Sequence, residues 1–181
     1  MLDTLPSFRY HPDPVATGSL VAADTRCPLC NLVRGYTYVG PTYAIDEVEG
    51  LCPWCIADGS AAQAYGADFI DIEVGVPAGV TATVLEEVSR RTPGFSGWQT
   101  EHWTYHCDDA CAFLGKVGAE QLASLPDEAR TAIAAESRAV DHWSEELLSD
   151  VLANLSRDGS PTGYLFQCLH CGAFTGYLDF D

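Results

Sequence analysis

The chain has 181 residues, 47% of them hydrophobic, and carries a formal charge of −17 from 26 acidic and 9 basic residues. A chain of this length and composition can bury an ordinary core as one domain or two small ones, so wholesale disorder is not expected. The acidic residues are spread along the whole sequence and such a charge repels phosphate backbones, so we expect no nucleic-acid partner.

Membrane and export segments are not expected either. No stretch approaches the roughly 20 apolar residues of a membrane helix, and residues 1–14 lack a basic segment followed by an apolar run. The sequence therefore predicts a cytoplasmic protein that has no membrane partner.

The first unusual stretch is residues 8–14, FRYHPDP, in which two prolines favour an extended backbone. His11 and Asp13 could form an acid–base pair there. The interpretation that we favour is that they brace the N-terminal segment against the rest of the protein.

Two C-x-x-C pairs follow, CPLC at Cys27 and Cys30 and CPWC at Cys52 and Cys55. Their separation is close to that of a zinc module with two cysteine pairs. Residues 34–44 between them are aromatic and β-branched with a Gly-Pro step, which predicts strand, turn, strand. An Ala-rich stretch after Cys55 predicts a short helix that ends at Gly66. This order is typical of a treble clef, and a zinc ribbon is the alternative.

A helix from about Thr83 to Arg91 is predicted next, because Thr83 and Glu86 have capping-box spacing and Pro93 follows the last turn. The last residues of this helix and the segment after it could line a pocket for an anion. The region comprises Arg90, Arg91, Trp98, Gln99 and His102. The alternative, which we favour, is that the arginines neutralise the helix C-terminus and the tryptophans pack in the core.

The last two cysteine pairs frame a long insertion. Cys107 and Cys111 would lie one above the other if CDDACAFLG is helical. Residues 126–159 have a helical apolar stripe with Gly159 as the stop, and a break in the helix is expected near Val140. β-like runs flank Cys168 and Cys171, which predicts that this pair is the knuckle of a C-terminal hairpin.

Eight cysteines in four tight pairs point to metal. A disulfide framework needs an oxidising compartment, and a thioredoxin-like site would explain only one pair. Two tetrahedral zinc sites use all eight thiolates. We predict two structural Zn²⁺ ions with the ligands Cys27, Cys30, Cys52, Cys55, Cys107, Cys111, Cys168 and Cys171.

Several alternatives to this ligand set stay open at this point. His102, His106 or His170 lies beside the cysteines and could replace one of them as a ligand. One zinc site with one redox-active pair is a further alternative. The sequence also does not distinguish zinc from iron.

These elements predict an α+β fold, with small β-hairpin zinc-knuckle modules of treble-clef or zinc-ribbon type and a helical insertion. We place the first zinc module and the N-terminal segment in residues 1–66. Residues 67–181 then form a helical region with the second zinc module, closed by the C-terminal hairpin.

Six motifs together resemble the CbrC family of bacterial proteins, over nearly the whole chain from about Phe8. They are FRYHPDPVATGS, CPLC with RGYTYVGP after it, CPWCIADGSAA, RTPGFSGWQ, HCDDACAFLG and YLFQCLHCG. The family name is attached to colicin tolerance. The resemblance implies the same eight cysteines and no catalytic residues.

The leading interpretation is a zinc-stabilised acidic cytoplasmic protein that acts as an interaction or stress and toxin (colicin) tolerance module, without enzymatic activity. Its partner would be a protein, and the charge favours a basic one. Two alternatives remain. One is an enzyme that uses the Arg90–His102 region or His11 and Asp13. The other is a redox sensor in which thiolate oxidation ejects zinc.

Overall fold

The computed structural model describes residues 4–72, 75–99, 101–139 and 142–181, and it has the predicted α+β composition of helices with small antiparallel sheets. The elements in chain order are β1 (Leu20–Ala22), β2 (Tyr36–Tyr38), α1 (Pro53–Ala57), α2 (Ser60–Tyr65), α3 (Ala82–Arg91), β3 (Tyr105–His106), β4 (Asp109–Ala110), β5 (Ala112–Val117), α4 (Ala119–Ala123), α5 (Asp127–Ala139), α6 (Glu145–Ala153), β6 (Thr162–Gln167) and β7 (Phe174–Asp179).

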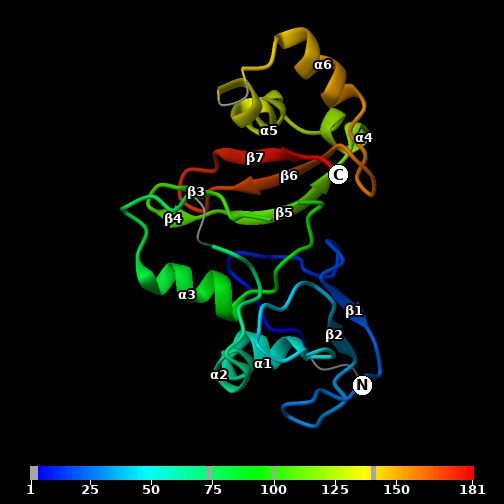
Figure 1. The fold of residues 1–181 in the computed structure, drawn as a ribbon, viewed down its shortest axis with the longest axis vertical. Helices are drawn as coiled ribbons and strands as arrows, with labels where there is room; N and C mark the ends of the chain where they lie inside the picture. The colour runs from blue at the N-terminus through cyan, green and yellow to red at the C-terminus, as the bar shows by residue number, and fades with distance from the viewer. Residues whose placement is uncertain (1–3, 73–74, 100, 140–141) are drawn as a thin grey trace.

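The antiparallel sheet β5–β6–β7 lies in the middle of the molecule. Figure 1 shows α4, α5 and α6 on one side of it, and the N-terminal part with β1, β2, α1 and α2 on the other. Strand β6 explains this layering, because its alternate side chains enter different cores. Tyr164 and Phe166 belong to an aromatic core, whereas Leu165 packs with Ile133 of α5.

Close approach of α5 to the sheet depends on a glycine in β6. A Cβ atom at Gly163 would lie 2.9 Å from a methyl carbon of Val117 and 3.3 Å from one of Ile133. The missing side chain therefore makes room for the helix, and a larger residue would push it away from the sheet.

The N-terminal part has a core of its own around the first two cysteine pairs. Strands β1 and β2 are antiparallel, with Leu20 opposite Tyr38, and α1 and α2 follow. The sequence predicted a hairpin between the two cysteine pairs, and this detail is wrong. The strand that pairs with β2 precedes Cys27, so the first pair lies in the loop of the hairpin.

Helix α3 forms as predicted, although it begins earlier. Thr81 is the N-cap, and its side-chain oxygen accepts a hydrogen bond from the backbone amide of Val84 at 3.4 Å. The predicted helical insertion is also present, as α5 and α6. Helix α5 ends at Ala139 and helix α6 begins at Glu145. The predicted break at Val140 lies outside the described residues.

Residues 107–115 do not form the helix in which Cys107 and Cys111 would lie one above the other. Cys107 and Asp108 have φ angles of 54° and 56°, so both adopt the left-handed conformation of a two-residue hairpin turn. The turn joins β3 to β4, in which His106 lies opposite Asp109. Residues 112–117 then continue as β5 and pair with β6. Long-range strand pairing overrides the local helical spacing here.

Backbone contacts tie the N-terminal segment to the central sheet, since the amide of Phe113 donates to the carbonyl oxygen of Tyr10 at 2.8 Å. The predicted domain boundary after residue 66 stays a prediction. Beyond it, Phe69 packs in the N-terminal core and Ile70 in the aromatic one. In the described part of the chain, no helix has both the length and the apolar character to cross a membrane.

Candidate metal centres

Four cysteines from the first two pairs meet at one point. The Sγ atoms of Cys27, Cys30, Cys52 and Cys55 all lie within 4.8 Å of one another. The Cys27–Cys55, Cys30–Cys52 and Cys52–Cys55 separations are 3.9, 3.7 and 3.5 Å. Cys27, Cys52 and Cys55 are at most 5% exposed, so this first group is buried in the N-terminal core.

Local backbone structure presents these sulfurs. Cys27 and Cys30 lie on a tight loop, closed by hydrogen bonds from the amide of Cys27 to the carbonyl of Leu32 and from Asn31 to Cys27. Asn31 has a φ of 58°, a left-handed conformation that Asn tolerates well. Cys52 is the N-cap of α1 and Cys55 lies in its first turn, so the helix start orients the second pair.

The Cys168–Cys171 loop repeats this pattern. The amide of Cys168 donates to the carbonyl of Ala173, and that of Gly172 donates to Cys168. Gly172 has a φ of 74° and occupies the position of Asn31 in the first loop. The chain therefore contains two equivalent knuckles. Each ends with a left-handed residue directly after its second cysteine.

The electrostatics of the first group favour a cation at its centre. Burial raises the pKa of Cys27, but the backbone amides of Cys30, Cys52 and Leu29 outweigh it and lower this pKa to about 7. Burial, together with the neighbouring Cys27, raises the pKa of Cys52 to about 11. Four thiolates this close repel one another, so the fully ionised group requires a bound positive charge.

The second group contains three cysteines and a histidine. Ligand atoms of His106, Cys107, Cys168 and Cys171 lie within 4.8 Å of one another. The His106 Nδ1 atom is 3.2 Å from the Cys107 sulfur and 3.4 Å from that of Cys171, and these two sulfurs are 3.8 Å apart. His106, Cys107 and Cys171 are exposed, unlike most of the first group.

Cys111 lies outside this second group, contrary to the sequence prediction. It is fully buried in the aromatic core, with its thiol beside the hydroxyls of Thr104 and Thr175, and burial raises its pKa. The prediction required a helix that would align Cys107 with Cys111. In the hairpin that forms instead, the turn places His106 beside Cys107, and this histidine was among the alternatives considered from sequence.

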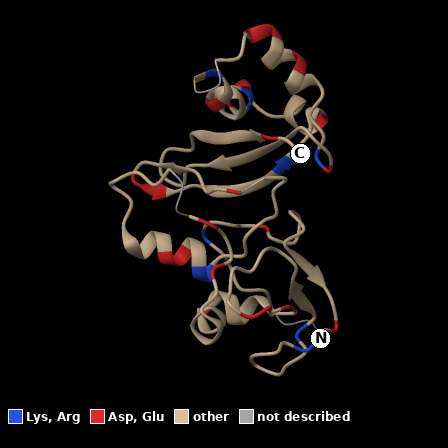
Figure 2. Ribbon diagram, viewed as in Figure 1, with Lys and Arg blue, Asp and Glu red and all other residues tan. Residues whose placement is uncertain are grey.

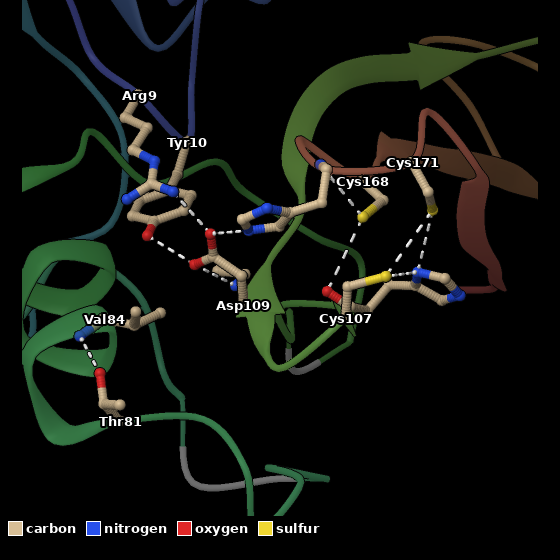
Figure 3. A network of polar contacts seen from close by, with 11 residues as sticks. Arg9, Tyr10, Thr81, Val84, Cys107, Asp109, Cys168 and Cys171 are labelled. Atoms are coloured by element: carbon tan, nitrogen blue, oxygen red, sulfur yellow. Dashed lines mark hydrogen bonds and ion pairs between the residues drawn. The ribbon is translucent and has the colours of Figure 1, made fainter.

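The buried carboxylate of Asp109 is hydrogen-bonded to the Cys168–Cys171 loop (Figure 3). Asp109 is 5% exposed, and its Oδ2 atom accepts from His170 Nε2 at 2.8 Å and from Arg9 at 2.6 Å. Its Oδ1 atom accepts from the hydroxyl of Tyr10 at 2.7 Å. Burial raises the pKa of Asp109, but these hydrogen bonds and the charge of Arg9 outweigh it and lower the pKa. Asp109 thus joins the N-terminal segment to the Cys168–Cys171 loop.

The structure divides the predicted anion pocket between two cavities. Arg90 donates to Asp68 at 3.0 Å and lines a cavity of about 620 Å³ with Tyr43 and Glu86. Arg91 donates instead to the carbonyl of Ala57 at 3.0 Å. The two arginines therefore face the N-terminal part of the molecule.

Gln99 and His102 line the other cavity, of about 350 Å³, with Glu136 of α5. The His102 ring stacks on Tyr177 at 3.8 Å between centroids, and burial lowers the pKa of His102. Trp98 is 47% exposed and donates through its indole to the carbonyl of Gly159. The residues predicted to converge do not share one site.

The other candidate pair is separated as well. Both ring nitrogens of His11 are engaged, Nδ1 with the carbonyl of Pro93 at 2.7 Å and Nε2 with the hydroxyl of Thr17 at 2.6 Å. The Asp13 carboxylate accepts from the backbone amide of Ala16. These contacts fit the bracing role that the sequence favoured.

The fold and the two ligand groups define a small α+β protein with two four-ligand groups positioned to bind metal ions. The chain belongs to the family described as uncharacterised protein family UPF0167, whose model matches residues 5–180.

Close relatives cover nearly the whole chain. It is 52% identical over 177 residues to UPF0167 protein Mb2317 of Mycobacterium bovis, covering 97% of this chain and 94% of the relative. It is 44% identical over 178 residues to UPF0167 protein PA1536 of Pseudomonas aeruginosa, covering 97% of each. No solved structure matches the chain. The CbrC name stays a prediction.

Proposed function

We propose that this protein binds two structural zinc ions, one in each ligand group. The observation that carries the proposal is the spacing of the ligand atoms. Ligands about 2.3 Å from a central ion lie roughly 3.8 Å apart at the corners of a tetrahedron. The sulfur–sulfur distances of 3.5–3.9 Å match this edge without any rearrangement.

Thiolate and imidazole donors in tetrahedral sets of four are typical of zinc. The first ion would be held by the buried Cys₄ group, and the second by His106, Cys107, Cys168 and Cys171. Each set is complete, so no coordination position is left for a substrate. A structural role follows from this closure, and the position of Cys52 at the start of α1 supports a treble-clef-like arrangement of the first site.

Metal analysis of the purified chain tests this proposal. We expect two zinc ions per chain. X-ray absorption should fit a total of seven sulfur ligands and one nitrogen ligand over the two ions, which is an average of 3.5 sulfurs and 0.5 nitrogen per ion. Cys52→Ser should lose one ion and unfold the N-terminal core, because metal binding supplies folding free energy there. Iron in place of zinc, or one metal at full occupancy, contradicts the assignment.

We further propose that the protein acts by binding a basic partner protein. The support is the charge of −17, which is not confined to one element. Figure 2 shows Asp and Glu on the N-terminal part, on α3 and on the helices above the sheet. A surface of this sign accelerates encounter with basic proteins and repels nucleic acid.

DNase-type toxins are one class of basic partner, since they must bind DNA, and the CbrC resemblance links this class to tolerance. The test is binding of the purified protein to a basic nuclease domain and to duplex DNA across a salt series. Direct capture predicts tight, salt-sensitive nuclease binding with no DNA binding. Weak attraction of the kind that any polyanion shows would refute capture.

A further inference from the structure

The two ligand groups differ in one property that matters for reactivity, which is access to solvent. In the first group, Cys27, Cys52 and Cys55 are 0%, 2% and 5% exposed. In the second, Cys107 and Cys171 are exposed together with His106, and only Cys168 is buried. Access to thiolate sulfur is a main determinant of which cysteines react with oxidants.

The exposed sulfurs are also neighbours. Cys107 lies in the two-residue turn between β3 and β4, and Cys171 ends the knuckle between β6 and β7. Their Sγ atoms are 3.8 Å apart, and a disulfide needs about 2.05 Å. Because both sulfurs lie in surface loops, the approach does not require the sheet or the aromatic core to move.

We propose that Cys107 and Cys171 form an oxidation site for hydroperoxides, at which disulfide formation releases the second zinc ion. This inference rests on the proposed zinc binding. It deepens that proposal by assigning redox chemistry to one of the two sites. Hydrogen peroxide is neutral, so the charge of −17 does not repel it as it would an anionic oxidant.

The chemistry has two balanced steps. One thiolate attacks a peroxide oxygen, so that an S–O bond forms, the O–O bond breaks and hydroxide leaves. The other thiolate attacks the resulting sulfenic sulfur, so that the S–S bond forms, the S–O bond breaks and a second hydroxide leaves. Two electrons pass from the sulfurs to the peroxide. With Cys107 and Cys171 joined, only His106 and Cys168 would remain as ligands, too few to hold a zinc ion in this group.

The first group provides an internal comparison within the same molecule. Its sulfurs lie as close together, at 3.5–3.9 Å, so proximity alone would make it equally prone to disulfide formation. Burial of Cys27, Cys52 and Cys55 in the N-terminal core, where only Cys30 is partly exposed, is what separates the first group from the second. The order of zinc release therefore tests the role of solvent access.

The experiment uses the full chain loaded with zinc, treated with hydrogen peroxide in the presence of a chromophoric zinc chelator, with chelator alone as the control. We expect one equivalent of zinc to be released at least about tenfold faster than the second. Peptide mapping after the first release should find the Cys107–Cys171 disulfide. A thiol reductant with added zinc should restore two ions per chain.

Cys111→Ala is the matched control, because Cys111 is buried outside both groups and its removal should leave the release rates unchanged. Two zinc ions that leave at the same rate, or a first disulfide within the N-terminal group, overturn this inference alone. Fewer than two bound ions before peroxide is added contradict the proposed function and this inference with it.

Discussion

His11 provides a sharp test of the packing of the N-terminal segment. Its imidazole is fully buried and lies in a T-shaped arrangement with the Phe113 ring, with centroids 5.1 Å apart, and burial lowers its pKa from 6.5 to about 4. The Pro93 carbonyl can only accept, so Nδ1 carries the proton. Because the lowered pKa keeps the ring neutral, Nε2 is then an acceptor, and the Thr17 hydroxyl donates to it at 2.6 Å in preference to the Asp13 carbonyl, which is 3.2 Å away. The folded protein therefore holds His11 in one neutral tautomer.

The pH dependence follows from this lowered pKa. Between pH 6.5 and about 4 the unfolded chain binds a proton at His11 that the folded chain does not, so stability falls as pH falls through this window. The contribution is fully present above pH 6.5. The loss amounts to about 2 kcal/mol at pH 5 and about 3 kcal/mol below pH 4.

Urea unfolding at pH 8 and pH 5, in wild type and His11→Gln with the same added zinc, measures this effect. Thiolate protonation also weakens metal binding at low pH, but it affects both proteins and cancels in the difference. We expect wild type to lose about 2 kcal/mol more than the variant. Equal losses, or an NMR titration that finds His11 protonated near pH 6.5, would refute the buried neutral state.

Three further predictions concern the second site and the surface. His106→Gln should lower the zinc content from two ions to one, whereas Cys111→Ala should keep both ions. Loss of an ion in Cys111→Ala but not in His106→Gln would instead support the ligand set expected from sequence. Asp109→Asn should lower the free energy of unfolding by about 2 kcal/mol because it weakens charged hydrogen bonds to His170 and Arg9. Its exposed neighbour Asp108 offers the control Asp108→Asn, for which a change above about 0.5 kcal/mol would argue against this explanation. Nuclease binding should weaken steeply as salt rises from 50 to 200 mM, by about tenfold or more, and salt-independent binding would exclude the acidic surface as its cause.

Local chemistry made the first metal site predictable from sequence. A C-x-x-C pair places two sulfurs on one tight loop whatever the rest of the chain does, and two such pairs at module spacing have an obvious way to meet. The C-terminal hairpin and α3 were likewise encoded locally, by β-like runs around Cys168 and by helix start and stop signals around residues 83–93, although the cap that forms is Thr81 and not the predicted Thr83. Short-range sequence patterns of this kind do not determine the redox state of the compartment, the localisation of the protein or its partner.

The second site shows what sequence alone did not decide. The spacing of Cys107 and Cys111 fits a helix as well as it fits a turn followed by a strand, and only pairing of β5 with β6 selects the strand. That selection sends Cys111 into the aromatic core and leaves His106 beside Cys107.

Long-range packing also separated Arg90 from His102, although the two lie close in sequence. Arg90 is held by Asp68 at the N-terminal core, whereas the stacking of His102 on Tyr177 draws it to β7. Sequence thus determined which residues can bind metal or fold locally. Only the tertiary structure decided which of them meet, because strand pairing and core burial act between residues far apart in the chain.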